Sequence, residues 1–234
     1  METLAVETTT NIISLALHGD DKDLLTVSMD GCGQGVVTIF TLLQDLLDMG
    51  GLSVKDIGRV AVNVGPGDFT GSRIGVIFAK TFSLIAGISL YGFNTLEVMV
   101  SGMETADKGL IMPVLDVRRG YCYFCGFRKA GSINHDGGFG LTEVFKPDFE
   151  KIENLRARLI TIPGEKMILI QKGRRDSLLK NALEGMEFIE GDLISAAGLI
   201  SALPFFNLSE IESDPHEVLP VYPANFELFF KGRG

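Results

Sequence analysis

Apolar residues follow two different periodicities along the first half of the chain. Short apolar runs that end at Gly, Asn, Thr or Ser predict β-strands, and longer segments with apolar residues three and four positions apart predict helices. The strands are predicted over residues 2–8, 12–18, 24–29, 59–64 and 88–92, and the helices over 36–49, over 72–86 and from Asn94 or Thr95 onward. This order of strands and helices predicts an α/β lobe with a mixed sheet.

The second half of the chain shows the same kind of pattern after a polar break at residues 104–109. Strands are predicted over 110–116, 121–127, 141–145 and 167–171, helices over 147–156 and 195–203, a linker over 207–220, and an apolar tail over 221–230. Both halves open on an apolar strand rich in Thr or Asp, which suggests a duplicated α/β unit. We therefore predict an N-terminal lobe, residues 1–103, and a C-terminal lobe, residues 104–234, whose tail docks back on the body.

The charge and the cysteine content narrow the class of protein. The chain has 234 residues, with 30 Asp and Glu against 21 Lys and Arg, and a formal net charge of −9. Neutralisation of phosphates by Lys and Arg supplies most nucleic-acid affinity, so an acidic chain is a poor stand-alone nucleic-acid binder. If RNA is involved, another subunit supplies the basic surface. The odd number of cysteines, three, and a start without the features of a signal peptide predict a reducing cytosol.

Two polar turns are candidates for phosphate binding. Glu7, Thr8 and Thr9 follow the first strand, and an acid with hydroxyls in a tight turn can hold a metal-bound phosphate, although a polar hairpin turn explains them more simply. Gly65 and Gly67 belong to a Gly-rich strand-to-helix turn whose backbone N–H groups suit an anion. The same glycines also suit positive φ angles and close packing. The turn lacks the Lys-Ser/Thr of a Walker loop and the spacing of a dinucleotide fingerprint, so both interpretations stay open.

The two long helices of the first half are apolar over more than one face. Such a helix is either fully buried or covered by a partner. Because two of them flank one lobe, we favour a helix-on-helix subunit interface. The residues predicted for this interface are Val36, Phe40, Leu43, Leu47, Ile74, Ile77 and Phe78.

The remaining chemistry-bearing residues do not assemble into a known motif. The histidines, His18, His135 and His216, are scattered, and no H-E-x-x-H, H-x-x-x-H or G-x-S-x-G pattern occurs. Cys122 and Cys125 lie three apart in one predicted strand, hence on opposite faces, which predicts two small buried residues rather than a metal or redox pair. The sequence therefore predicts no metal site and no catalytic nucleophile.

One apolar segment and one basic cluster have simpler explanations than special functions. The stretch 74–93 carries Lys80 near its middle and three glycines, so we predict a buried helix followed by a strand rather than a membrane span. The basic run 172–175, like Arg118 and Arg119, could touch phosphate, but short clusters on an acidic chain are more often solvated surface.

Three motifs resemble the TsaB (YeaZ) family, whose members are required for tRNA threonylcarbamoyladenosine synthesis. The motifs are L-A-V-E-T-T…S-L-A-L near the start, V-A-V-N-V-G-P-G-D-F-T-G-S-R-I-G around residues 60–75, and P-V-L-D-V-R-R-G-Y-C-Y at 113–123. They occur in the family's order and at its distances, and the element G-P-G-x-F-T-G-x-R at 65–73 is very specific. The resemblance is clear over residues 1–125 and thin beyond them.

The resemblance implies a two-lobed actin-like fold, of the ribonuclease H-like superfamily of sugar kinases and chaperone ATPases, with mixed sheets flanked by helices. It implies a cytoplasmic, non-catalytic subunit that binds and supports a metal-carrying paralogue, TsaD, which transfers threonylcarbamoyl to tRNA. The small ATPase TsaE joins the complex, and tRNA is reached only through it. The family's pairing surface matches helices 36–49 and 72–86, and homodimers through the same helices are expected when the paralogue is absent.

Two departures from the family pattern bear on nucleotide binding. Glu7 stands where the family usually has Asp, and residues 32–35 replace a usual His-Ser pair. The rival hypothesis is an ATP-binding phosphotransferase or ATPase of the same fold, using Glu7, Thr8, Thr9 and the 65–71 turn to bind ATP or ADP weakly with Mg²⁺. A protease, an older label of the family, is disfavoured because no metal or nucleophile constellation is visible.

Overall fold

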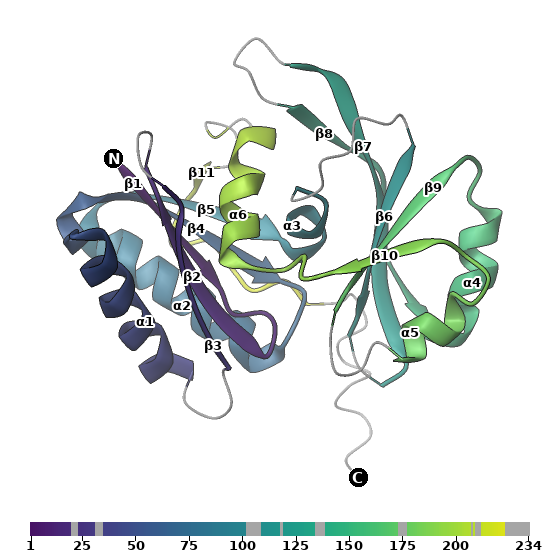
Figure 1. Ribbon diagram of the computed structural model, residues 1–234, viewed down its shortest axis with the longest axis horizontal. Coiled ribbons are helices and arrows are strands. Elements are labelled where there is room, and N and C mark those ends of the chain that lie inside the picture. The colour runs from purple at the N-terminus through teal and green to yellow at the C-terminus, as the bar shows by residue number, and fades with distance from the viewer. Residues whose placement is uncertain are drawn as a thin grey trace.

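The computed structural model of the chain describes residues 1–19, 23–30, 35–101, 109–117, 119–133, 139–172, 177–206, 208 and 212–222. Two mixed sheets stand side by side, with helices on their outer faces and between them (Figure 1). Several predictions fall wholly or partly outside the described residues. They concern residues 104–108 of the lobe boundary at 104–109, residues 32–34 of the departure at 32–35, the basic residues 118 and 173–175, and the tail beyond Tyr222.

The first sheet has the strand order β11-β5-β4-β1-β2-β3. Its strands are β1 (Glu2–Glu7), β2 (Ile12–His18), β3 (Leu25–Asp30), β4 (Ile57–Gly65), β5 (Ser89–Asn94) and β11 (Glu212–Ser213). Three helices follow its strands in sequence: α1 (Gly35–Gly50), α2 (Phe69–Ala86) and α3 (Thr95–Ser101), with a short 3-10 turn at Val54–Asp56. Helices α1 and α2 cover the outer face of this sheet (Figure 1).

The second sheet has the strand order β10-β9-β6-β7-β8. Its strands are β6 (Leu110–Asp116), β7 (Tyr121–Ile133), β8 (Phe139–Lys151), β9 (Lys166–Gln171) and β10 (Phe188–Gly191). The associated helices are α4 (Ile152–Thr161), α5 (Ser177–Ala182) and α6 (Ala196–Ala202), followed by a 3-10 turn at Leu203–Phe205. Helices α4 and α5 lie on the outer side of this sheet (Figure 1).

The two sheets are built by the same topology. In the first, β1, β2 and β3 form an antiparallel meander, and β4 and β5 add in parallel beside β1. In the second, β6, β7 and β8 form the meander, and β9 and β10 add in parallel beside β6. A helix follows the third, fourth and fifth strand of each unit. This repetition supports the hypothesis of a duplicated unit and is the arrangement expected of the predicted fold class.

The third helix of each unit packs against the sheet of the other unit. Helix α6 places Leu199 and Ile200 against Ala5, Ala16 and Ala61 of the first sheet. Helix α3 contributes to a cluster with Ile111, Cys125 and Leu169 of the second sheet, through Leu96, Met99 and Val100. Both helices lie between the sheets (Figure 1). The C-terminal part of the chain therefore returns to the first sheet already at α6, earlier than the predicted docking tail.

The strands and helices of the first half are confirmed, with α2 beginning three residues earlier than predicted. In the second half, the helix predicted over 147–156 is wrong at its start, because β8 continues to Lys151 and α4 begins only at Ile152. Pairing with β7 overrides the helical pattern. Pro147 lies in a β-bulge between Phe145 and Asp148, which pair with Gly126 and Phe124 of β7. The short elements α5, β10 and β11 were not predicted.

The cysteines and the apolar stretch have the structural roles predicted for them. Cys122 and Cys125 are fully buried on opposite faces of β7, and burial raises the pKa of Cys122 to about 12 and that of Cys125 further. The stretch 74–93 forms most of α2 and β5. In the parts of the chain that the structure describes, no helix is long and apolar enough to cross a membrane.

Candidate functional site

The predicted phosphate-binding residues meet in a buried hydrogen-bond network at the carboxyl end of β1. Glu7 is fully buried, and its Oε1 accepts hydrogen bonds from the backbone N–H of Thr9 and, at 2.7 Å, from the Thr9 hydroxyl. Its Oε2 accepts from Nδ2 of Asn63 at 2.6 Å. Asn63 comes from β4, the neighbouring strand, so the network joins the β1–β2 turn to the strand that leads into the Gly-rich turn.

Asn63 fixes the direction of the hydrogen bonds in this network. Its Oδ1 accepts from the backbone N–H of Gly65 at 3.0 Å and from the Thr95 hydroxyl at 2.9 Å. Because a backbone N–H can only donate, Nδ2 must be the half of the amide that faces Glu7. Sequence reasoning missed Asn63 and Thr95, although a lone Asn inside the apolar run of β4 was a visible signal for a buried polar contact.

The glycines of the second motif allow the two turns to pack in direct contact. A Cβ on Gly67 would lie 2.4 Å from the carbonyl oxygen of Thr9, and one on Gly71 would lie 1.9 Å from that of Thr8. The backbone N–H of Asp68 also donates to the carbonyl of Thr9, at 2.6 Å. Since not even a methyl group would fit at Gly67 or Gly71, the two turns leave no room for a phosphate between them.

The N-terminus of α2 is already capped by its own chain. Oδ1 of Asp68 accepts from the backbone N–H groups of Thr70 and Gly71, at 3.1 and 2.9 Å. These are the donors that would hold an anion at a helix N-terminus. With Glu7 buried and hydrogen-bonded as well, the residues as placed do not fit a magnesium-bound nucleotide phosphate. This geometry does not favour nucleotide binding, which stays a prediction for the residues Glu7, Thr8, Thr9, Gly65 and Gly67.

The Glu7 carboxyl should make stability depend on pH. Burial raises its pKa from 4.5 to about 7, and the hydrogen bonds from Thr9 and Asn63 limit the rise. Between these two values the folded chain binds more protons than the unfolded chain, so the free energy of unfolding should fall as the pH rises through this window, by about 3 kcal/mol. Glu7→Gln, which does not titrate, should reduce the fall measured by urea denaturation between about pH 5 and about pH 8, and Glu97, whose pKa is also raised by burial, accounts for part of what remains.

An exposed acid provides the control for this measurement. Glu153 on α4 is 71% exposed, and Glu153→Gln should leave the pH dependence of the unmodified chain in place. If Glu7→Gln shows the same fall as the unmodified chain, Glu7 is not the group that titrates.

The described end of the chain is held against the Gly-rich turn and α2. The backbone N–H of Val221 donates to the carbonyl of Val64 at 2.7 Å. Arg73 donates from Nε to the hydroxyl of Tyr222 at 2.8 Å, and its guanidinium lies 3.9 Å from the centroid of the Phe69 ring. Lys80 adds a third anchor, from Nζ to the carbonyl of Val218 at 2.8 Å. These contacts hold residues 218–222 against α2 and the Gly-rich turn, and the docking predicted for the tail as a whole stays a prediction.

Arg73→Ala should loosen this docked segment without unfolding the chain. Loss of the hydrogen bond and of the cation–π contact should cost about 1 kcal/mol, since both groups are partly exposed. Hydrogen exchange at the amide of Val221 should become roughly fivefold faster, while amides in β1 keep their protection. Arg73→Lys keeps the positive charge but not the forked guanidinium, so its exchange rate at Val221 should lie between those of the unmodified chain and Arg73→Ala. Unchanged protection of Val221 would mean that Arg73 does not hold the tail.

The outward surface of α1 and α2 carries large exposed apolar side chains. We call it the α1–α2 face and define it by Val37, Phe40, Ile77, Leu84 and Ile85, which are 63, 58, 63, 47 and 83% exposed. The rings of Phe40 and Phe78 are 5.6 Å apart, so the two helices meet beneath this face. Apolar exposure concentrated on two adjacent helices is typical of a protein interface.

The predicted interface residues divide between this face and the core. Phe40 and Ile77 are exposed, and Ile74 is half-buried. Leu43, Leu47 and Phe78 are at most 9% exposed and belong to the core beneath the helices, so their predicted role as contact residues is corrected. The helical pattern gave their apolar character but not the direction of the sheet. The side chain of Val36 lies outside the described residues.

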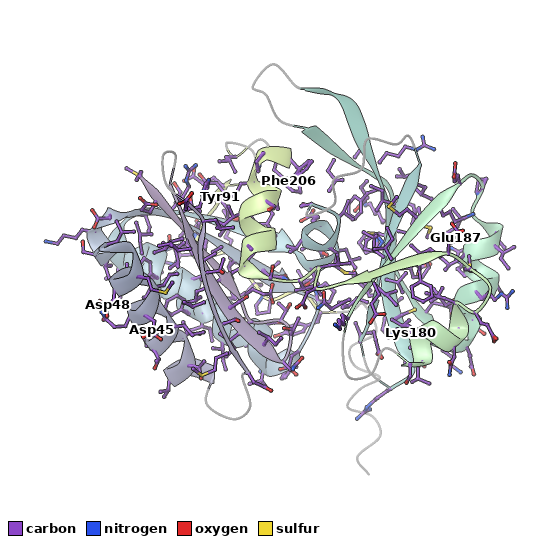
Figure 2. All side chains as sticks on the ribbon, viewed as in Figure 1. Asp45, Asp48, Tyr91, Lys180, Glu187 and Phe206 are labelled. Carbon is purple, nitrogen blue, oxygen red and sulfur yellow. The ribbon has the colours of Figure 1, made fainter. Side chains whose placement is uncertain are left out.

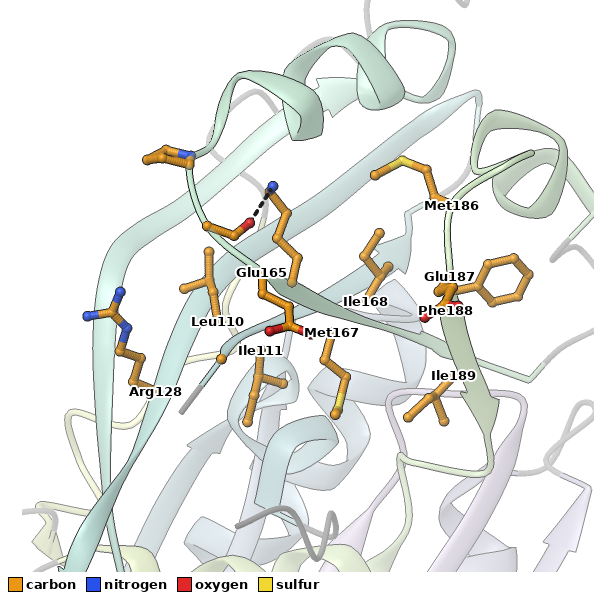
Figure 3. A pocket seen from close by; sticks show the side chains of 14 residues that line it. Leu110, Ile111, Arg128, Glu165, Met167, Ile168, Met186, Glu187, Phe188 and Ile189 are labelled. Atoms are coloured by element: carbon orange, nitrogen blue, oxygen red, sulfur yellow. Dashed lines mark hydrogen bonds between the residues drawn. The ribbon is translucent and has the colours of Figure 1, made fainter. Parts of the chain in front are cut away.

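A separate hollow of about 990 Å³ opens on the second lobe, at the N-terminal ends of β6, β9 and β10 (Figure 3). Its walls combine apolar side chains, such as Met167 and Phe188, with charged ones, such as Arg128 and Glu187. Nζ of Lys166 at its rim donates to the carbonyl of Gly164 at 3.0 Å. None of the predicted site residues is among its lining residues. Among the described residues no group of three or more His, Cys, Asp or Glu could hold a metal ion.

Comparisons with known proteins place the chain in a family. A family model described as "TsaD: tRNA N6-adenosine threonylcarbamoyltransferase" matches residues 35–173, which is more than half of the chain. The "tRNA threonylcarbamoyladenosine biosynthesis protein TsaB" of Escherichia coli K12 is 30% identical over 167 residues, covering 69% of this chain and 71% of that protein. The protein of the same name from Bacillus subtilis is 27% identical over 225 residues, covering 95% and 93%.

Solved structures agree on the fold. YeaZ from Pseudomonas aeruginosa superimposes with a TM-score of 0.73 at 17% identity, covering 94% of this chain and 99% of that one. Component A of (R)-2-hydroxyglutaryl-CoA dehydratase from Acidaminococcus fermentans gives a TM-score of 0.52 at 9% identity, covering 90% and 99%. Together with the motifs in β1, the Gly-rich turn and β6, these matches assign the chain to the family that the TsaD model describes and, within it, to the TsaB (YeaZ) family.

Proposed function

We propose that this chain is a non-catalytic subunit in tRNA threonylcarbamoyladenosine biosynthesis that binds and supports a TsaD-like threonylcarbamoyltransferase. The observation that carries the proposal is the α1–α2 face, where Phe40, Ile77 and Ile85 are more than half exposed. Leaving such side chains in water is unfavourable, and covering them with a partner is the ordinary way to remove the cost. The pathway comes from the names of the TsaB relatives.

The closed polar network supports a role other than catalysis. A catalytic acid needs a free oxygen that reaches a substrate, whereas both carboxylate oxygens of Glu7 accept hydrogen bonds from Thr9 and Asn63 inside the protein. The network instead holds the Gly-rich turn, and with it α2, in a fixed position on the sheet. We infer that it serves the α1–α2 face as a rigid support.

The further members of the assembly follow from charge and from the family. With a net charge of −9 the chain is unsuited to bind tRNA alone, so tRNA is reached through the complex. A TsaE-like ATPase is the third component, and the chain forms a homodimer through the α1–α2 face when its paralogue is absent. The location is the cytoplasm, where tRNA modification takes place.

The test is reconstitution with the TsaD-like transferase and the TsaE-like ATPase of the same organism. Size-exclusion chromatography should show a complex of this chain with the transferase, and threonylcarbamoyladenosine formation on tRNA should require this chain. Modification at the same rate without it, or separate elution of the two proteins, would contradict the proposal.

The alternative function, ATP-dependent phosphotransfer or ATP hydrolysis on the same fold, has a direct test. Titration calorimetry of the isolated chain with ATP and Mg²⁺ should give no tight binding, because the turns at Glu7 and Gly67 fill the space between them. Tight binding accompanied by turnover would favour the alternative over the proposed subunit role.

A further inference from the structure

Helix α1, which forms part of the α1–α2 face, also carries two exposed carboxylates. Asp45 and Asp48 lie in the C-terminal half of α1, are exposed, and project outward from the helix, away from the sheet (Figure 2). Oδ1 of Asp48 accepts from Nε2 of Gln44 at 2.9 Å, and among the described residues no Lys or Arg bonds to either carboxylate. The face is therefore apolar along one part and negatively charged along another.

These two acids are not explained by the stability of the helix. The C-terminal end of a helix carries a partial negative charge, which disfavours acids and favours Lys or Arg. Helix α1 has no basic residue in its last turn. Asp48, in the last turn, thus weakens α1 slightly in the isolated chain, and the dipole gives Asp45, one turn earlier, no stabilising role.

A second copy of the chain offers no free cation from the same helices. Helix α1 contains no Lys or Arg, and α2 contains only Arg73 and Lys80. Arg73 is held by Tyr222 and Phe69, and Lys80 bonds to the carbonyls of His216 and Val218. In a homodimer through the α1–α2 face, the acids would meet cations that already have partners within their own chain.

We propose that Asp45 and Asp48 select the partner of the α1–α2 face, by pairing with Lys or Arg that border the apolar helical surface of a different protein. This inference rests on the proposed function, and the partner is the TsaD-like transferase. Complementary charges at the border of an interface favour the correct partner, and the same charges left unpaired disfavour a wrong one. The two acids thereby bias the chain towards the heterodimer and away from its own copy.

The double variant Asp45→Asn/Asp48→Asn tests this selection. At about 0.05 M salt, its dissociation constant for the TsaD-like transferase of the same organism should be about tenfold higher than that of the unmodified chain. At about 0.5 M salt the difference should be much smaller, because salt already screens the charge pairs in the unmodified complex. Its self-association, measured by sedimentation equilibrium, should not weaken. Both residues are exposed, so the variant should fold normally.

A charge-matched control separates local pairing from net charge. Glu153→Gln/Glu184→Gln removes two exposed acids from the second lobe and should leave both associations unchanged. An unchanged heterodimer affinity in the Asp45/Asp48 variant, or an equal weakening of the homodimer, would overturn the inference while leaving the proposed function intact. If the unmodified chain does not bind the transferase at all, it is the proposed function that fails.

Discussion

Gly71→Ala should destabilise the chain by about 3 kcal/mol or more, and many molecules should fail to fold. The new methyl group would lie 1.9 Å from the carbonyl oxygen of Thr8, well inside van der Waals contact. That oxygen belongs to the backbone and cannot rotate away, so α2 would have to separate from the β1–β2 turn. The separation would also break the bond from the Thr8 hydroxyl to the carbonyl of Gly71, at 2.8 Å.

Urea denaturation followed by circular dichroism measures this loss, with Gly109→Ala as the matched control. A Cβ on Gly109 would lie 3.7 Å from the carbonyl oxygen of Glu165, which is an ordinary contact. The urea midpoint of the Gly109→Ala variant should therefore shift little. A Gly71→Ala chain with the midpoint of the control would show that the two turns are not in close contact.

Phe40→Asp/Ile77→Asp should abolish binding to the TsaD-like transferase at micromolar concentrations. Both side chains are mostly exposed in the isolated chain, at 58 and 63%, so charging them costs little folding stability. In a complex each carboxylate would be buried against apolar groups, and each substitution should weaken binding roughly 30-fold or more. Titration calorimetry or co-elution with the purified transferase measures the loss.

Ile160→Asp is the appropriate control for this experiment. Ile160 on α4 is 64% exposed, almost the same as Ile77, but it lies on the second lobe. Its substitution should leave binding unchanged. Equal loss of binding in the control and in the Phe40/Ile77 variant would argue against a contact localised to the α1–α2 face.

The elements of the first half could be predicted because each carries its own periodicity. In β4, successive apolar residues bounded by turn-forming ones predicted the strand, and Gly87 after α2 marked the end of that helix with a φ of +66°. The second half was less predictable. The residues after Phe145 read as a helix start in isolation, and only pairing with β7 keeps them in β8 as far as Lys151.

The candidate site was predictable in its members but not in its role. The sequence brought Glu7 and Gly67 into consideration through their turns, and the structure does place those turns together. Such glycines can either leave space for an anion or let two segments pack against each other. The outcome depends on the distance in space between segments some 60 residues apart in sequence, and no local sequence pattern gives that distance. The exposure of Phe40 and the burial of Leu43 likewise depend on which way α1 faces the sheet.

The exchange of α3 and α6 between the two units has a consequence for the synthesis of the chain. The inner face of the first sheet, around Ala5, Ala16 and Ala61, is covered by α6, and the backbone N–H of Ala196 bonds to the Ser14 hydroxyl across 182 residues of sequence. A nascent chain that has only emerged as far as α3 still lacks this cover. The N-terminal half should therefore mature only after nearly the whole protein has left the ribosome, and it should depend on chaperones until then.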